Sequence, residues 1–329
     1  MSLITANITD WSPATLRLLS MLLVLVTALS AGFYARKREV PEIWAKKIMM
    51  FVVVVLNWPV ALFVIWKMKL DKQYIWLPVI TVLLMLAVAL FSTLFSSLLK
   101  LNYKSRFTFI LASSLSNLSY TGGAFVCYAM FGQLGLGLAN LYIIFWLPTA
   151  YLVFFPILKI REMKNSDQPM KFSFNQIFDA RYIVLPAIFI ALLLNWLKIP
   201  QPQFIQSWHI IDFFIYSASF LAFFAIGLRV KVSRLKNYLN LYFPLACVKF
   251  IVSPVIAGLL IWILAMTGTR LSDIVIKVII ILSVTPCAVM MVMISNVFDL
   301  DSKLASALWV VNTAVFALIV VPILFMALN

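Results

Sequence analysis

The sequence predicts an all-α membrane protein with ten transmembrane helices, and three observations carry this prediction. The 329 residues are 64% hydrophobic and only 11% charged, which is far more apolar side chain than one soluble core buries. Apolar runs of roughly 20 residues, the length that crosses a bilayer as a helix, recur along the whole chain. Two of these runs contain helix-breaking residues halfway along, so two of the helices are expected to be broken inside the membrane.

The expected spans follow one another with short connections, and the sixth is the shortest. They cover residues 14–35, 44–66, 74–98, 107–131, 138–159, 182–197, 209–229, 241–266, 273–297 and 304–327. The first apolar run is preceded by neither a basic stretch nor a small-residue cleavage site. It is therefore expected to be a span rather than a signal peptide.

The formal charge of +15 is explained by topology rather than by nucleic acid. Of the 26 Lys and Arg residues, 18 lie in the gaps on one side of the predicted membrane, 7 lie on the other side, and Lys249 lies inside a span. Because cytoplasmic loops carry the excess of basic residues, the richer side is expected to be cytoplasmic and both termini to face outward. Beyond cargo, the partner expected from this pattern is membrane lipid, in the plasma membrane or a bacterial inner membrane.

Two halves of the chain share short sequence patterns. FFPIL at 154–158 returns as VVPIL at 320–324, an offset of 166 residues. Since each half holds five spans, an odd number, the halves are expected to be inverted relative to each other. The predicted organisation is a first five-helix repeat at 1–160, a cytoplasmic linker at 161–181 and a second five-helix repeat at 182–329.

The clearest sign of a broken helix lies in residues 279–300. Pro286 interrupts this apolar run, and a proline removes one backbone hydrogen bond and clashes with the preceding turn. The offset of 166 carries Pro286 to Tyr120, which is followed closely by Gly122 and Gly123, another common cause of a break. Two broken helices at matching positions of inverted halves point to a binding site where they meet.

Four segments, in the same order along the chain, resemble the auxin efflux carrier family of membrane transporters. They are GFYARK at 32–37, LNWPVAL at 56–62, FFAIGL at 223–228 and TPCAV at 285–289. The resemblance implies ten helices in two inverted repeats, with spans 1, 2, 6 and 7 as a scaffold and spans 3–5 and 8–10 as a moving transport domain. It implies that helices 4 and 9 cross at their breaks and that organic anions such as auxin or dicarboxylates are carried.

The fourth span departs from the family pattern N-x-x-x-x-G-x-P. With Gly123 at the glycine position, Phe125 takes the place of the proline and Leu118 that of the asparagine. Asn117 lies one residue away and serves only if the register shifts. Phe125 is expected to cap the site with an apolar ring.

Side chains and backbone near the two breaks form the predicted binding site for a carboxylate. Half-helix N-termini favour an anion without a buried cation, and asparagine inside a membrane is costly unless paired. The candidates are Asn117, Ser119, Tyr120, Thr121, Gly122, Gly123, Phe125, Thr285, Pro286, Cys287 and Asn312. For Asn117 and Asn312 a purely structural role, hydrogen bonding between helices, stays open.

Two charged residues are candidates for ion coupling. Lys249 either neutralises an anionic substrate or snorkels to the cytoplasmic face, and the sequence favours snorkelling. Asp212 either is simply solvated at an outer span end or exchanges a proton. Cys127 and Cys287 have no histidine or carboxylate nearby, so no metal site and no cofactor are expected. Proton coupling, sodium coupling and no coupling all stay open.

Three classes of function follow from these features. The leading one is a secondary carrier of a small organic anion that works by an elevator-type alternating access. The second is a transporter-like receptor or regulator that binds a ligand without net transport. An intramembrane enzyme is disfavoured, because the spans hold no aspartate pair at depth and the chain has a single histidine, at an interface. Assembly is left open, with a homodimer through the scaffold helices as the case to test.

Overall fold

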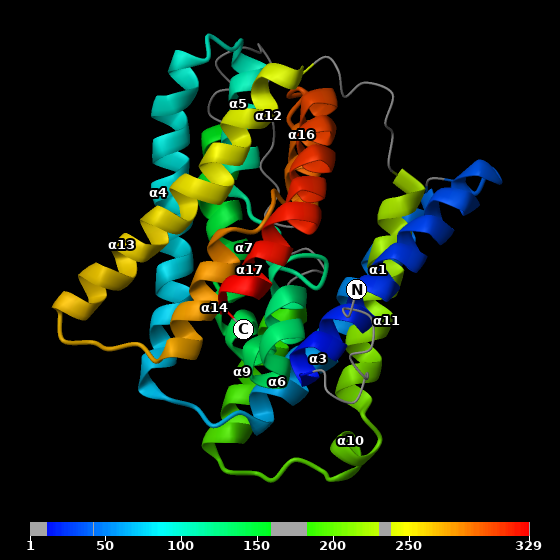
Figure 1. Ribbon diagram of the computed structural model, residues 1–329, viewed down its shortest axis with the longest axis vertical. Coiled ribbons are helices and arrows are strands. Elements are labelled where there is room, and N and C mark those ends of the chain that lie inside the picture. Colours follow the sequence, from blue (N-terminus) through cyan, green and yellow to red (C-terminus); the bar gives the residue numbers. More distant parts are fainter. Residues whose placement is uncertain (1–11, 42, 159–182, 230–237, 329) are drawn as a thin grey trace, which may run out of the picture.

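A computed structural model describes residues 12–41, 43–158, 183–229 and 238–328, and these residues fold almost entirely into helices (Figure 1). The predicted linker at 161–181 lies outside the described residues. The first half contains α1 (Pro13–Lys37), α2 (Ile43–Phe51), η2 (Val52–Asn57), α3 (Trp58–Lys67), η3 (Lys72–Ile75), α4 (Trp76–Leu98), α5 (Tyr103–Ser114), α6 (Gly123–Ile143), α7 (Trp146–Thr149) and η4 (Ala150–Phe154). The second half contains α9 (Val184–Trp196), α10 (Phe204–Ser207), α11 (Ile210–Arg229), α12 (Leu239–Cys247), η8 (Val248–Val252), α13 (Ser253–Met266), α14 (Asp273–Ser283), α15 (Val289–Val297), α16 (Ser302–Val315), η9 (Phe316–Val320) and α17 (Val321–Leu328).

Seven stretches of the described chain are long and apolar enough to cross a membrane as continuous helices. They are Pro13–Lys37, Ile43–Lys67, Lys72–Leu98, Gly123–Leu158, Ile210–Leu228, Leu239–Met266 and Ser302–Leu328. The protein is therefore an integral, multi-pass membrane protein, as its composition predicts. The other predicted spans are shorter for two reasons: α9 has only 13 residues, and the predicted fourth and ninth spans are interrupted.

The predicted boundary between spans four and five is a kink rather than a loop. Gly132 lies inside α6 with φ 62° and ψ −147°, a backbone conformation that only glycine adopts without strain. The helix axis changes direction there while the chain continues as helix to Ile143. The second half of the broken fourth span and the fifth span thus run on as one helical stretch.

Four π-helical turns lie directly before prolines. In η2, η4, η8 and η9 the last π-helical residue precedes the proline by two positions, at Pro59, Pro156, Pro254 and Pro322. A proline has no N–H and its ring displaces the carbonyl of the preceding turn, and one extra residue in that turn relieves the clash. Each helix therefore widens for one turn and continues, so these prolines do not divide their spans.

Helices α1 and α11 pack with their backbones in contact, side by side at the edge of the molecule (Figure 1). A Cβ atom added to Gly32 would lie 2.2 Å from the carbonyl oxygen of Phe224, and one added to Gly227 would lie 2.5 Å from that of Leu29. Any larger residue at either position would push the helices apart.

Helix α9 packs against α3 and supplies hydrogen-bond donors to the backbone carbonyls at the C-terminal end of α3. The Asn195 side-chain amide donates to the carbonyl oxygens of Trp66 at 2.9 Å and Met68 at 2.6 Å, and the Trp66 indole donates to the Ile199 carbonyl at 2.8 Å. The last carbonyls of a helix have no partner within it, so these bonds fix how α3 ends. Together α1, α3, α9 and α11 form one packed unit beside α6.

Candidate functional site

The two interrupted spans meet through backbone hydrogen bonds. Residues 115–122 separate α5 from α6, and residues 284–288 separate α14 from α15. Ser116 and Cys287 form an isolated antiparallel β-bridge. The Asn117 N–H donates to the Pro286 carbonyl at 2.7 Å, and the Ala288 N–H donates to the Leu115 carbonyl at 2.8 Å. We call residues 115–122 and 284–288 together the junction; both predicted breaks exist and they touch.

The glycine doublet allows this close approach. A Cβ atom on Gly122 would lie 2.1 Å from the Asn117 carbonyl oxygen, inside the loop of its own interruption. A Cβ atom on Gly123 would lie 2.5 Å from Leu282 and 2.7 Å from Thr285, both from the other interrupted span. Gly122 therefore permits the tight turn, and Gly123 lets the start of α6 pack on the end of α14.

The Asn117 side chain lies inside the first interruption, where it forms hydrogen bonds with residues of the same loop. Its amide group donates to Thr121 Oγ1 at 3.1 Å and to the Thr121 carbonyl at 3.2 Å, while Ser119 Oγ donates to its Oδ1 at 2.8 Å. Leu118 instead packs in the apolar core. Asn117 rather than Leu118 is thus the polar residue of this break, which corresponds to the shifted register.

Asn312, on α16, binds the second interruption. Its Oδ1 accepts the Cys287 N–H at 2.9 Å, and Asn312 is only 3% exposed. In an unbroken helix the Cys287 N–H would reach back to the Ser283 carbonyl. The sequence prediction that Asn312 lies close to the Pro286 break is confirmed by this contact.

The carbonyls that each break frees receive other donors. Proline 286 cannot donate to the Leu282 carbonyl, and Thr285 Oγ1 does so at 2.9 Å. The Ser283 carbonyl accepts instead from Ser253 Oγ at 2.7 Å. Buried carbonyls at the end of α14 are thereby satisfied, as membrane depth requires.

Lys249 likewise donates a hydrogen bond to a freed carbonyl, at the end of α5. Its side chain does not snorkel to the membrane surface. Its side chain is 0% exposed, and its Nζ donates to the Ser113 carbonyl at 3.2 Å and to Ser116 Oγ at 2.6 Å. The Ser113 carbonyl is free because its helical partner, the Asn117 N–H, bonds Pro286 instead. The preference for snorkelling inferred from sequence is therefore wrong: the ammonium points to the negative C-terminal end of a half-helix, which attracts it.

The N-terminal ends of the two half-helices have donors to spare. At α6 the N–H groups of Gly123 and Ala124 bond back into the interruption, whereas among the described hydrogen bonds none is made by the N–H of Phe125. At α15 the N–H groups of Val289 and Met290, the first two residues of that helix, likewise make none of the described hydrogen bonds. Unpaired N–H groups at a helix start attract an anion.

Three predicted site residues make their main contacts away from the junction. The Tyr120 hydroxyl faces Asn140 Oδ1 at 3.5 Å, on the later part of α6. The Phe125 ring packs edge-on against Phe223 of α11, with ring centroids 5.6 Å apart. Asp212, on α11, accepts a hydrogen bond from the Tyr128 hydroxyl and lies 3.3 Å from His209 Nδ1.

The Asp212 contact belongs to a polar group between α1, α6 and α11. Arg17 donates from Nε to the Ala129 carbonyl at 3.2 Å, close to the Gly132 kink where helical hydrogen bonding is interrupted. After Ser253 and Lys249, Arg17 is the third side chain that donates to a backbone carbonyl near the end of a half-helix in another part of the fold. Sequence reasoning missed Arg17, Ser253 and Tyr128 because nothing near them in the chain marks them.

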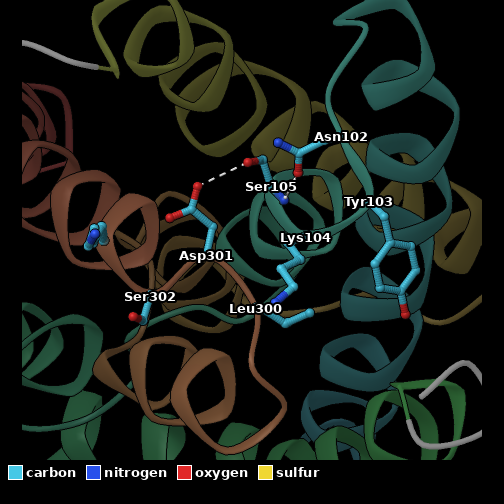
Figure 2. A pocket seen from close by; sticks show the side chains of 8 residues that line it. Asn102, Tyr103, Lys104, Ser105, Leu300, Asp301 and Ser302 are labelled. Carbon is cyan, nitrogen blue, oxygen red and sulfur yellow. Dashed lines mark hydrogen bonds between the residues drawn. The ribbon is translucent and has the colours of Figure 1, made fainter. Parts of the chain in front are cut away.

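A pocket that is open to solvent lies at the other end of α5. It measures about 530 Å³ and is lined by residues 102–105 and 300–303. Figure 2 shows Ser105 directed at Asp301, to which its hydroxyl donates at 3.0 Å, and Lys104 pairs with Asp299 at 2.5 Å. Of its lining side chains, Ser105 and Asp301 bond each other, and the 12 residues of α5 separate the pocket from the junction. Within the described chain no group of three or more metal-ligating side chains occurs.

Comparison with protein families supports the resemblance. The family model described as "Membrane transport protein" matches residues 18–325, nearly the whole chain. This family is of the auxin efflux carrier type, so the relationship suggested by the four segments is confirmed. A comparison with curated proteins gives no match.

Proposed function

Because the chain belongs to the membrane transport protein family, we propose that it is a secondary active carrier of a small organic anion and that the junction is its binding site. The observation that carries the proposal is the combination of polar groups there. Unpaired N–H groups of two half-helices and one fully buried ammonium, Lys249, lie at the same pair of interruptions. All of these groups attract negative charge.

The amides at the junction fit the same cargo. Asn117 and Asn312 are both buried and both bonded to the interruptions themselves. A carboxylate that enters can accept hydrogen bonds from the Asn117 amide group and from the hydroxyls of Ser119 and Thr121. Thr285, Pro286 and Cys287 form the opposite wall of the site.

For the transport cycle we propose elevator-type alternating access. Helices α1, α3, α9 and α11 would form the scaffold, and the interrupted spans with α4, α12–α13 and α16 would move past it with the cargo. In this arrangement the chain has ten spans in two inverted repeats. Support comes from the offset of 166 residues, which relates η4 to η9 and also the cap of α6, Gly122, to the cap of α15, Ala288.

The test is uptake by the purified protein in proteoliposomes. Labelled indole-3-acetate, benzoate and succinate are offered separately, with pH and sodium gradients varied independently, and empty liposomes and labelled glucose serve as controls. We expect saturable uptake of at least one carboxylate and none of glucose. Binding of a carboxylate without uptake would favour the receptor function, and neither binding nor uptake would reject the site.

A further inference from the structure

The oxygen atoms around Lys249 are of the kind that bind alkali cations in carriers with broken helices. Ser113 offers a carbonyl at the C-terminal end of a half-helix, and Ser116 offers a hydroxyl from the interruption itself. Freed carbonyls at half-helix C-termini are where such carriers coordinate sodium. In this protein an ammonium that is part of the chain already lies on these oxygens.

We propose that the Lys249 ammonium is the resident cation of the junction and replaces a co-transported metal cation, so that the anion moves without sodium coupling. This inference rests on the proposed transport function and specifies its coupling. Helix span α12–α13 supplies the ammonium from its π-helical turn η8. One turn further on, Ser253 holds the other half-helix end. One helical span thus supplies, through Lys249 and Ser253, permanent hydrogen-bond donors to the C-terminal ends of both half-helices.

The charge balance also limits the cargo. Among the described residues Lys249 has no acidic partner; the ion pairs found there join Lys104 to Asp299, His209 to Asp212 and Lys277 to Asp273. A buried cation is costly without a counter-charge. One carboxylate neutralises it, whereas a second carboxylate would find no further cation. The preferred cargo class is therefore a monocarboxylate.

The first experiment measures wild-type uptake in proteoliposomes. Labelled indole-3-acetate or benzoate is supplied with sodium, or with N-methyl-D-glucamine at the same ionic strength. We expect the two initial rates to agree and succinate to be taken up more slowly. A wild-type rate that requires sodium would overturn the inference while leaving the proposed transport of anions intact.

The second experiment does not depend on transport. The melting temperature of Lys249→Ala in detergent is measured in N-methyl-D-glucamine chloride, sodium chloride and methylammonium chloride. Alanine leaves the oxygens of Ser113 and Ser116 without a cation. A small cation that enters should therefore raise the melting temperature by about 3 °C or more at saturation. The wild type should show no such difference between the salts.

Two matched variants complete the design. Lys249→Met fills the same volume without a charge and should respond to no salt, and Lys277→Ala removes a lysine that has its own carboxylate partner 3.0 Å away and should behave as the wild type. A Lys249→Ala protein that responds to neither sodium nor methylammonium would overturn the inference. Absence of carboxylate uptake by the wild type, together with a salt response of Lys249→Ala, would reject the transport function but not the cation site.

Discussion

Cys287 offers the clearest case of one residue held by one distant side chain. Its N–H has a single acceptor, Oδ1 of Asn312, and Asn312→Leu leaves this N–H buried without a partner. The expected loss of stability is about 1–3 kcal/mol, measured by thermal unfolding in detergent.

Its control is the next residue along the chain. Thr313 Oγ1 is buried and has no hydrogen-bond partner in the described structure. Thr313→Val removes a hydroxyl of the same depth and should be neutral or slightly stabilising, since no bond is lost. Equal losses from Asn312→Leu and Thr313→Val would show that the Asn312 bond contributes nothing of its own.

Asn117 should matter for transport more than for folding. Asn117→Ala removes the amide that bonds Thr121 and the oxygen that accepts from Ser119. We expect carboxylate uptake to fall at least about tenfold, the value of one to two such hydrogen bonds in the site. Expression and monodispersity should be retained. The exposed Asn296, bonded only within its own helix, is the control, and Asn296→Ala should transport normally.

Single residues also show which site features a sequence reveals. Asn117, Asn312 and Pro286 could be predicted because an amide or a proline at membrane depth is costly and needs a local reason. Lys249 was misassigned, because depth along a helix does not say which way a side chain points. Its partner oxygens, the Ser113 carbonyl at the end of α5 and Ser116 Oγ in the interruption, lie more than 100 residues earlier. The Ser113 carbonyl is free only because the Asn117 N–H bonds Pro286.

Among the helices, the contact of α1 with α11 gives the sharpest prediction. In Gly32→Val and Gly227→Val the new Cβ atom would lie no more than 2.5 Å from a backbone oxygen of the facing helix. The helices must separate, and we expect each variant to lose about 3 kcal/mol of stability or to fail to accumulate. The measurement is the thermal unfolding of purified protein, with yield as the second readout.

The control glycine lies in α13. A Cβ atom on Gly258 meets nothing within 4 Å, so Gly258→Ala should gain up to about 1 kcal/mol from the higher helix propensity of alanine. Stability that is unchanged in Gly32→Val would contradict the close packing of α1 on α11.

The helices also show where sequence patterns mislead. Prolines at 59, 156, 254 and 322 look as disruptive as Pro286, yet each is absorbed by one π-helical turn. Pro286 breaks its helix because residues 284–288 find other partners: Leu115, Asn117 and Asn312 bond that backbone from outside. Whether a proline kinks or divides a helix thus depends on tertiary donors and acceptors that a single segment does not contain.

For the whole molecule, composition predicted most of what the structure describes. Apolar runs placed six of the seven long helical stretches to within a few residues, the exception being Gly123–Leu158. Unsatisfied backbone groups are costly in lipid, and a helix satisfies them within one segment. The lengths of the two interruptions, eight residues at 115–122 and five at 284–288, could not be predicted. They depend on how two segments 166 residues apart pair, which no local pattern encodes.

The orientation of the whole chain in the membrane is the remaining prediction from charge. Helix α10 and the start of α16 lie at opposite ends of the molecule (Figure 1). Gln203, directly before α10, and Lys303, in the first turn of α16, are both exposed. Lys104 and Lys303, two of the basic residues assigned to the richer side, line one pocket at that end, so that end should be cytoplasmic. An impermeant maleimide added to intact cells should label Gln203→Cys but should label Lys303→Cys only after permeabilisation. The natural Cys127 and Cys287 are buried and should add little background, and the half-buried Cys247 is replaced by alanine in both variants. The reverse labelling pattern would place the termini in the cytoplasm. It would also put the pocket of residues 102–105 and 300–303 outside the cell.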